Sequence, residues 1–87
     1  MRLEFHKRFE KEFAKLPEKV KQKANAVIQN FLTNPLDPQL HNHALTGNLK
    51  SFLAISVTGD IRIIFEEFNH YTLVILLNVG THSQVYK

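Results

Sequence analysis

The spacing of apolar residues changes along the chain, from a helical period in the first part to a strand-like pattern in the second. Apolar residues recur at helical spacing over residues 7–16 and again over residues 20–32, which predicts two amphipathic helices. Pro17 separates the helices, and residues 34–35 (Asn-Pro) end the second one, because proline disfavours helical backbone in the residue before it. So short a connection predicts an antiparallel helix hairpin.

Beyond the helices, short apolar runs bounded by turn signals predict strands. Three such runs are present: residues 52–57, 61–66 and 71–79. Gly59 suits a hairpin loop between the first two, and the last two are almost continuously apolar, which indicates central strands covered on both faces. Residues 2–5 are expected to form an edge strand. The order βααβββ predicts one domain over residues 1–87, an α+β fold in which a helix hairpin packs on one face of an antiparallel sheet.

The composition is ordinary for a single small globular domain. The 87 residues are 44% hydrophobic and include no cysteine, which excludes a disulfide framework and thiolate chemistry. No apolar run approaches the roughly 20 residues of a membrane span. The charged N-terminus also lacks the apolar centre of a signal peptide. We therefore expect a cytoplasmic protein without a membrane partner.

The net charge of +3 is distributed unevenly. Residues 1–50 hold nine Lys and Arg against five Asp and Glu, whereas residues 51–87 hold two against three. A basic half favours an anionic partner, either a nucleic acid or an acidic protein segment. A well-solvated pair of helices accounts for the same charge equally well. The helix lysines expected to face outward include Lys15, Lys19, Lys21 and Lys23.

Five histidines in 87 residues are the first candidates for chemistry, because an imidazole titrates near neutral pH. His6 and His70 are interpreted as solvated polar residues. His41 and His43 are two residues apart, but no second pair with metal-ligand spacing accompanies them, so we expect no metal site. His82 follows the last predicted strand, where an imidazole at the mouth of a sheet is placed for proton transfer. Such residues are nevertheless more often plain surface residues.

Two polar residues interrupt the apolar strands. Arg62 stands inside the 61–66 run, where a charge is costly unless it is paired or solvated. Arg62 therefore either pairs with a carboxylate, such as Asp60 or Glu66, or lines a wet concave face. Asn78 is a similar interruption in the last strand. Tyr86 is either a packing residue or a platform on which a base stacks.

The chain lacks a glycine-rich phosphate loop, a GxSxG nucleophile elbow and the paired carboxylates of sugar hydrolysis. The remaining inventory is histidines, an aspartate, an arginine and lysines. That set suits attack of an RNA 2′-hydroxyl on the neighbouring phosphate. The reaction needs a base, an acid and cations for the charged transition state, and it needs neither a metal nor an enzyme nucleophile.

Several motifs resemble those of a known group of proteins. They are DPxLxxHxLxG over residues 37–47, Lys50, GDxRIxF over residues 59–65, and the closing GTHxxxY over residues 80–86. With the βααβββ order, they cover nearly the whole chain. The chain resembles the RelE/ParE superfamily of type II toxin–antitoxin toxins, most closely the YafQ-like ribosome-dependent mRNA endonucleases. The resemblance implies a metal-independent endoribonuclease that inhibits translation, with a cognate antitoxin, the ribosome and mRNA as partners.

The resemblance also implies which residues form the site. His43, Asp60 and His82 match active-site positions, with His43 or Asp60 as base or orienting group and His82 as general acid. Arg62 matches an arginine that handles the scissile phosphate in the RelE branch. Further substrate contacts are expected from Lys50, Asn78 and Tyr86, and ribosomal RNA contacts from Lys15, Lys19, Lys21 and Lys23.

Two departures from the YafQ pattern leave other functions open. Ser56 stands where a histidine is usual, and Asn78 stands where an arginine is usual. Arg62 offers a replacement for the missing positive charge. One alternative is a ParE-like DNA gyrase inhibitor without nuclease activity, because both classes share the fold. The other is a catalytically weakened homologue that binds antitoxin.

Overall fold

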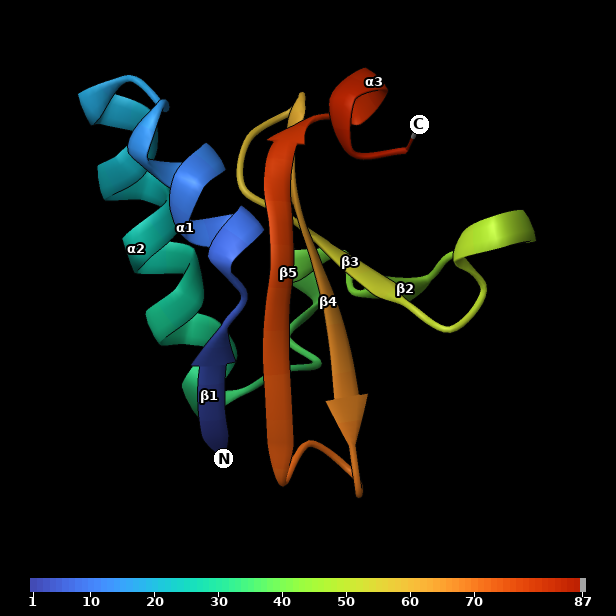
Figure 1. Ribbon diagram of the computed structural model, residues 1–87. Helices are drawn as coiled ribbons and strands as arrows, with labels where there is room; N and C mark the ends of the chain where they lie inside the picture. Colours follow the sequence, from blue (N-terminus) through green and yellow to red (C-terminus); the bar gives the residue numbers. More distant parts are fainter. Residues whose placement is uncertain (87) are drawn as a thin grey trace.

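The sheet runs through the middle of the molecule, with two helices on one face and a short third helix on the other (Figure 1). The computed structural model describes residues 1–86. Its helices and strands are β1 (Arg2–Phe5), α1 (Lys7–Ala14), α2 (Glu18–Thr33), β2 (His43–Ala44), β3 (Leu53–Ser56), β4 (Ile61–Phe68), β5 (Leu73–Thr81) and α3 (His82–Val85). These elements confirm the predicted α+β fold and its βααβββ framework. The short β2 and α3 are additions to it.

The strands are ordered β1-β5-β4-β3-β2 across the sheet. β3, β4 and β5 form the predicted antiparallel meander, and the apolar β4 and β5 occupy interior positions as expected. β1 is an edge strand, but it pairs with β5 in parallel, so the sheet is mixed. A parallel neighbour requires a long connection, and the chain from α1 to β4 supplies it. β2 forms the opposite edge and is antiparallel to β3.

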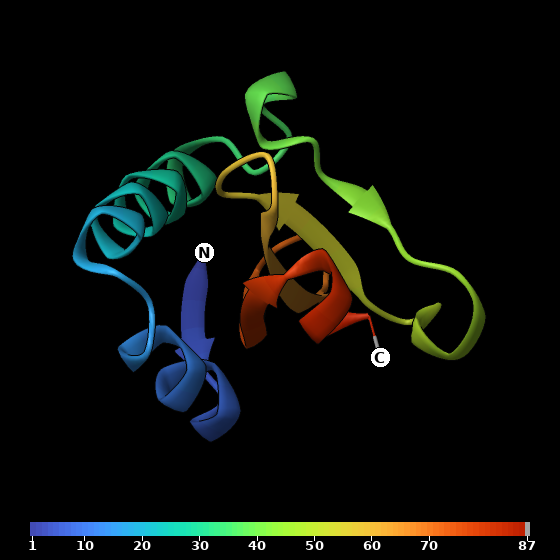
Figure 2. The same ribbon diagram turned by 90° about the horizontal axis from the view of Figure 1, so that it is seen from above.

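The helices follow the boundaries that the sequence indicates. His6 caps α1, because its Nδ1 accepts a hydrogen bond from the backbone N–H of Arg8 at 3.0 Å. α2 begins after Pro17 and ends at Thr33. The two helices run in opposite directions in Figure 1, which confirms the hairpin, and Figure 2 shows both at the end of the molecule away from β2. Within residues 1–86, no helix combines the length and hydrophobicity needed to cross a bilayer.

Apolar side chains are buried on both faces of the sheet. The main core lies beneath α1 and α2, where the rings of Phe31 and Phe65 meet edge to face at 4.9 Å. A smaller core lies beneath α3 and contains Ala54, Ile64 and Val85. The predicted helix hairpin therefore covers only one face. The four-residue α3 covers part of the other.

A β-bulge in β5 decides which residues share the α3 face. Ile64 pairs with Asn78, but the next residue, Phe65, pairs with Leu76, so β5 carries one extra residue at this point. Beyond the bulge, Gly80 lies opposite Arg62. The bulge thus places Gly80, from which α3 departs, on the same face of the sheet as Arg62.

Candidate active site

Two open hollows adjoin at His43, which lies on the edge strand β2. The first has a volume of about 530 Å³ and extends from Lys23 on α2 to Arg62 on β4. The second has a volume of about 520 Å³ and contains His82 and Tyr86 from the end of the chain. His43 lines both hollows. The fold therefore brings β2, β4 and α3 to adjoining surfaces, although they lie far apart in the sequence.

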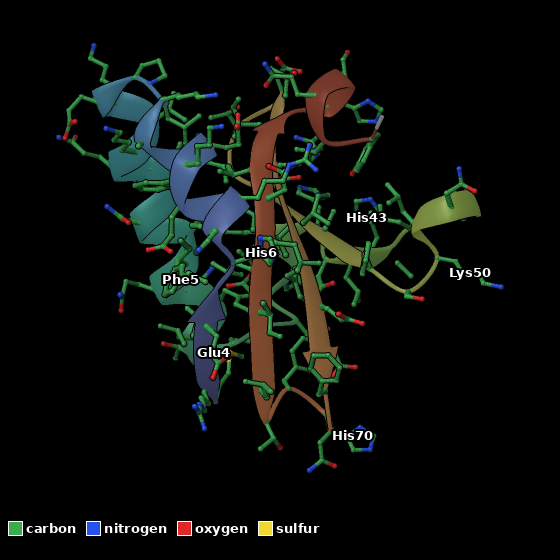
Figure 3. All side chains as sticks on the ribbon, viewed as in Figure 1. Glu4, Phe5, His6, His43, Lys50 and His70 are labelled. Atoms are coloured by element: carbon green, nitrogen blue, oxygen red, sulfur yellow. The ribbon has the colours of Figure 1, made fainter. Side chains whose placement is uncertain are left out.

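In the part of the chain that the structure describes, the imidazole of His43 makes one hydrogen bond, to a backbone carbonyl. Its Nδ1 lies 2.8 Å from the carbonyl oxygen of His41, and His41 adopts a left-handed conformation with φ of 52°. A carbonyl oxygen only accepts hydrogen bonds, so Nδ1 carries the proton in the neutral ring and Nε2 carries the lone pair. The side chain is exposed and is labelled in Figure 3. His43 is therefore suited to accept a proton at Nε2.

Arg62 lies half-buried on β4, in a row with Ser56 on β3 and Gly80 on β5. Its Nη1 donates to the backbone carbonyls of Thr58 at 2.9 Å and Ile61 at 3.2 Å. Among residues 1–86, no carboxylate lies within ion-pair distance of the guanidinium. Arg62 therefore forms no closed ion pair in this part of the chain, and it lines the first open hollow. Its Nη2 and Nε make no hydrogen bond to residues 1–86 and are donors for an anionic group.

His82 is positioned by the turn that starts α3. Thr81 and Gln84 form a reciprocal capping box, with Gln84 Oε1 accepting from the Thr81 backbone N–H at 2.8 Å. A side chain at Gly80 would lie 2.8 Å from that same oxygen, so it would displace the Gln84 side chain from the capping box where α3 folds back over β5. The backbone N–H of His82 donates to the carbonyl of Asp60 at 3.1 Å. These contacts tie α3 to the β3–β4 hairpin.

Tyr86 packs beside His82, and both residues line the second hollow. The two rings meet edge to face with their centroids 4.2 Å apart. The Tyr86 hydroxyl is buried and has no hydrogen-bond partner in the part of the chain that the structure describes. The ring thereby limits the orientations open to the His82 imidazole, whose other side is exposed to solvent.

Asp60 lies at the same end of the sheet, in the β3–β4 hairpin, but it lines neither hollow. Its backbone is fixed by the Thr58 hydroxyl, which accepts from the Asp60 N–H at 3.2 Å. The carboxylate is exposed and makes no ion pair within residues 1–86. Asp60 is therefore joined to His82 through its backbone rather than through its carboxylate.

The other predicted contact residues are spread more widely. Lys23 lines the first hollow with His43 and Arg62. Lys15 is paired with Glu12 at 3.2 Å. Lys50 is exposed at the outer end of the loop after β2 (Figure 3). Of the predicted lysines, four therefore line neither hollow: Lys15, Lys19, Lys21 and Lys50.

Asn78 also lies apart from the two hollows. It lines a separate hollow of about 230 Å³ on the same face of the sheet, together with His6 and Arg8. Its Oδ1 accepts from the backbone N–H of Val79 at 2.9 Å. The structure therefore does not bring Asn78 together with His43.

Sequence reasoning missed two residues that support the site. The backbone carbonyl of Thr58 accepts a hydrogen bond from Arg62. Its hydroxyl accepts from the backbone N–H of Ile61 and so stabilises the β3–β4 hairpin. Gln84 completes the capping box that orients α3. The T-x-x-Q spacing of Thr81 and Gln84 was a readable signal for this helix start. Within residues 1–86, no three His, Asp or Glu side chains converge as a metal cluster.

The whole sequence, residues 1–87, matches the family model described as the bacterial toxin of type II toxin–antitoxin system, YafQ. The chain belongs to the YafQ toxin family. The resemblance seen in its motifs is thereby confirmed, and so is its assignment as a type II toxin. A comparison with curated proteins finds no match.

Solved structures support the same fold. YafQ from E. coli BL21(DE3) is 20% identical with a TM-score of 0.82, and 100% of each chain is covered. In the E. coli DinJ–YafQ toxin–antitoxin complex the identity is 21% and the TM-score 0.77, with 98% of this chain and 96% of that chain covered.

Two further structures extend the comparison. A conserved Helicobacter pylori protein is 30% identical with a TM-score of 0.69, covering 95% of this chain and 96% of that one. A YoeB/ParE toxin from Agrobacterium tumefaciens is 14% identical with a TM-score of 0.77, covering 94% and 99%. This YafQ family toxin thus has the fold of the wider toxin group, while the roles of its individual residues stay a prediction.

Proposed function

We propose that this YafQ family toxin is a ribosome-dependent mRNA endoribonuclease. One observation carries the proposal: His43 lies between the hollow that contains Arg62 and the hollow that contains His82. A lone-pair nitrogen, a guanidinium and a second imidazole therefore face adjoining open surfaces. Attack of an RNA 2′-hydroxyl on the neighbouring phosphate requires a base, an acid and a cation, and these three groups can supply them.

His43 is assigned the role of general base. Its Nε2 carries the lone pair, because Nδ1 donates to the His41 carbonyl at 2.8 Å. When Nε2 takes the proton from the 2′-hydroxyl, the same carbonyl stabilises the imidazolium that forms. Asp60 is left as an orienting group for the hairpin, since its carboxylate lines neither hollow.

His82 is assigned the role of general acid. The 2′-oxygen forms a bond to phosphorus as the bond from phosphorus to the 5′-oxygen breaks, and His82 donates a proton to that leaving oxygen. The products are a 2′,3′-cyclic phosphate and a 5′-hydroxyl end. Arg62 stabilises the extra negative charge on the phosphate oxygens during the transfer. Tyr86 holds the His82 ring from behind, at a centroid distance of 4.2 Å.

The basic helical surface is assigned to the RNA backbone. Lys23 lines the first hollow and would contact message phosphates next to the scissile bond. Lys19 and Lys50 are exposed and would meet ribosomal RNA, where phosphate contacts supply affinity without sequence recognition. The exposed pair of Lys15 with Glu12 is weak enough to exchange for a phosphate.

Cleavage is tested in a cell-free translation system programmed with a defined message. We expect the toxin to stop translation and to cut the message only when ribosomes are present, leaving 2′,3′-cyclic phosphate ends. The matched assay is DNA supercoiling by gyrase. Inhibited supercoiling with an intact message would select the ParE-like alternative, and no effect in either assay would select the weakened homologue that only binds antitoxin.

The cognate antitoxin is the second proposed partner, because the related E. coli toxin is seen in a complex with DinJ. A groove of about 620 Å³ between β1, α1 and α2 suits its docking. The rings of Phe5, Phe9 and Phe13 follow one another along it at 5.6 and 5.7 Å. Phe5 is 47% exposed, and exposed apolar patches mark protein interfaces. The net charge of +3 favours an acidic, amphipathic segment as occupant.

Replacing Phe5 with serine is expected to weaken antitoxin binding by about 10- to 100-fold, the effect of losing one aromatic anchor. Cleavage should be unchanged, because Phe5 lies on the β1 edge and His43 on the opposite β2 edge. Titration calorimetry with the antitoxin encoded beside the toxin measures the affinity. Phe68→Ser is the control, since Phe68 is also exposed, at 39%, but lies outside the groove. An equal loss in both variants would contradict the docking site.

A further inference from the structure

The segment that carries His43 into the site is fastened by one side-chain amide. Asn42 Nδ2 donates to the carbonyl of Pro35 at 2.9 Å and to the hydroxyl of Tyr71 at 3.0 Å. Asn42 is half-buried and immediately precedes His43. The amide therefore joins the connector between α2 and β2 to the turn between β4 and β5, which lies 29 residues further along the chain.

Tyr71 is a firm anchor for that amide because its ring is packed on the main core. It meets Phe31 at a centroid distance of 6.1 Å and Phe65 at 6.3 Å. Its backbone N–H donates to Glu67 Oε1 at 2.9 Å. Packing of the ring against both phenylalanines holds its hydroxyl in one place.

The turn that presents Tyr71 is strained. Asn69, His70 and Tyr71 have φ values of 57°, 55° and 65°, a run of left-handed conformations that residues other than glycine rarely adopt. Such strain persists only where the surrounding contacts enforce it, and it often accompanies function. Here the strained turn places the Tyr71 ring against the core and its hydroxyl within hydrogen-bond distance of Asn42.

His43 needs an anchor of this kind. It lies on a strand of two residues at the edge of the sheet, and its side chain is exposed. Within residues 1–86, its one ring hydrogen bond is to the carbonyl of His41, whose direction depends on the left-handed φ of 52° at His41. Asn42 links the two histidines. Any shift of Asn42 would therefore turn the His41 carbonyl away from His43 Nδ1.

We propose that Asn42 and Tyr71 are positioning residues for His43. They hold the His41 carbonyl against Nδ1 and so keep the lone pair on Nε2, without touching the RNA themselves. This inference rests on the proposed role of His43 as general base. It gives Tyr71, which lies in the β4–β5 turn and is remote from His43 in the sequence, a positioning role in the reaction.

Tyr71→Phe tests the proposal, because it keeps the packed ring and removes only the hydroxyl. We expect kcat for message cleavage to fall about tenfold, as is usual when the support of a catalytic group is lost, with KM changed less than about twofold. Thr72→Val is the matched control. It removes the hydrogen bond from Thr72 Oγ1 to the Asn69 carbonyl at 2.7 Å, in the same turn, and Thr72 makes no hydrogen bond to Asn42 within residues 1–86. It should lower the melting temperature similarly and leave kcat unchanged.

A second pair of variants separates positioning from general destabilisation. Asn42→Ala should reduce kcat at least as much as Tyr71→Phe, because it removes the bond to Pro35 as well as the bond to Tyr71. The double variant should lose no more than Asn42→Ala alone, because the bond to Tyr71 is already absent in that variant. Additive losses in the double variant would contradict a shared role. Equal kcat losses in Tyr71→Phe and Thr72→Val would reduce Tyr71 to a stability residue.

The tautomer of His43 supplies a readout that does not depend on activity. Nitrogen-15 NMR of the histidine rings should show the His43 proton on Nδ1 in the wild-type toxin. In Tyr71→Phe it should be shared between Nδ1 and Nε2. A wild-type ring protonated on Nε2, or a tautomer unchanged in the variant, would overturn the inference. If the NMR result holds but the toxin cuts no message, the positioning stands and the nuclease proposal fails.

Discussion

Replacing His82 with alanine is expected to lower kcat for ribosome-dependent cleavage by about 10²- to 10⁴-fold, the usual contribution of one general acid or base. The leaving 5′-oxygen would lose its proton donor. The fold should survive, because α3 is started by Thr81 and Gln84 rather than by His82. Single-turnover cleavage on programmed ribosomes measures the rate, and circular dichroism checks the fold.

Two companion variants sharpen this result. Ser83→Ala alters the neighbouring exposed residue of the same short helix and should cleave at the wild-type rate. His82→Gln keeps a polar side chain that cannot give up a proton at neutral pH, and it should be as inactive as alanine. Wild-type cleavage by His82→Ala would remove His82 from the mechanism. Wild-type cleavage by His82→Gln would show that His82 acts as a hydrogen-bonding group and not as a proton donor.

The second large effect is expected at Arg62. Arg62→Met should lower kcat by about 10²- to 10³-fold, as when a preorganised donor to the transition-state charge is lost. Arg62→Lys should recover only part of the activity, because an ammonium group cannot reproduce the planar guanidinium fork. Arg2→Met is the control. Arg2 is exposed, pairs with Glu4 at 2.8 Å and lies on the β1 edge, so its loss should leave cleavage unchanged.

The stability of Arg62→Met distinguishes a catalytic from a structural arginine. The variant loses the hydrogen bonds to Thr58 and Ile61, which contribute about 0.5–1.5 kcal/mol each. It also removes a half-buried charge that has no carboxylate partner within residues 1–86, which offsets part of that loss. Urea denaturation should therefore show a change in unfolding free energy of about 2 kcal/mol at most. A larger loss that matches the loss of activity would make Arg62 a structural residue.

The regular elements could be predicted because their apolar periodicity reports directly on burial. The 7–16 and 20–32 patterns became α1 and α2, and the three apolar runs became β3, β4 and β5. β2 was missed, since a strand of two residues is too short to show a period. α3 was missed for the same reason, although its capping-box spacing at Thr81 and Gln84 was visible. The parallel pairing of β1 with β5 was missed because neither strand records its neighbour's direction.

The candidate site could be predicted only in part. His43, Arg62 and His82 were identified from motifs and from a charge in an apolar strand, and the structure brings them to adjoining hollows. Asn78 was grouped with them as a polar interruption of an apolar strand and Lys50 by motif, and they lie elsewhere. The support of His43 by Asn42 and Tyr71 had no signature in the sequence, because a hydrogen bond between residues 29 positions apart leaves no local pattern.

By itself, the sequence of this YafQ family toxin determined its family, its α+β class and the residue types available for chemistry. Each of these follows from local information: apolar period, turn residues and short motifs. The tertiary structure alone decided that Arg62 faces a hollow without a carboxylate partner among residues 1–86, and that the His43 ring presents Nε2. Both depend on backbone carbonyls whose positions are set by the packing of distant segments, and no local pattern of side chains records where those carbonyls point.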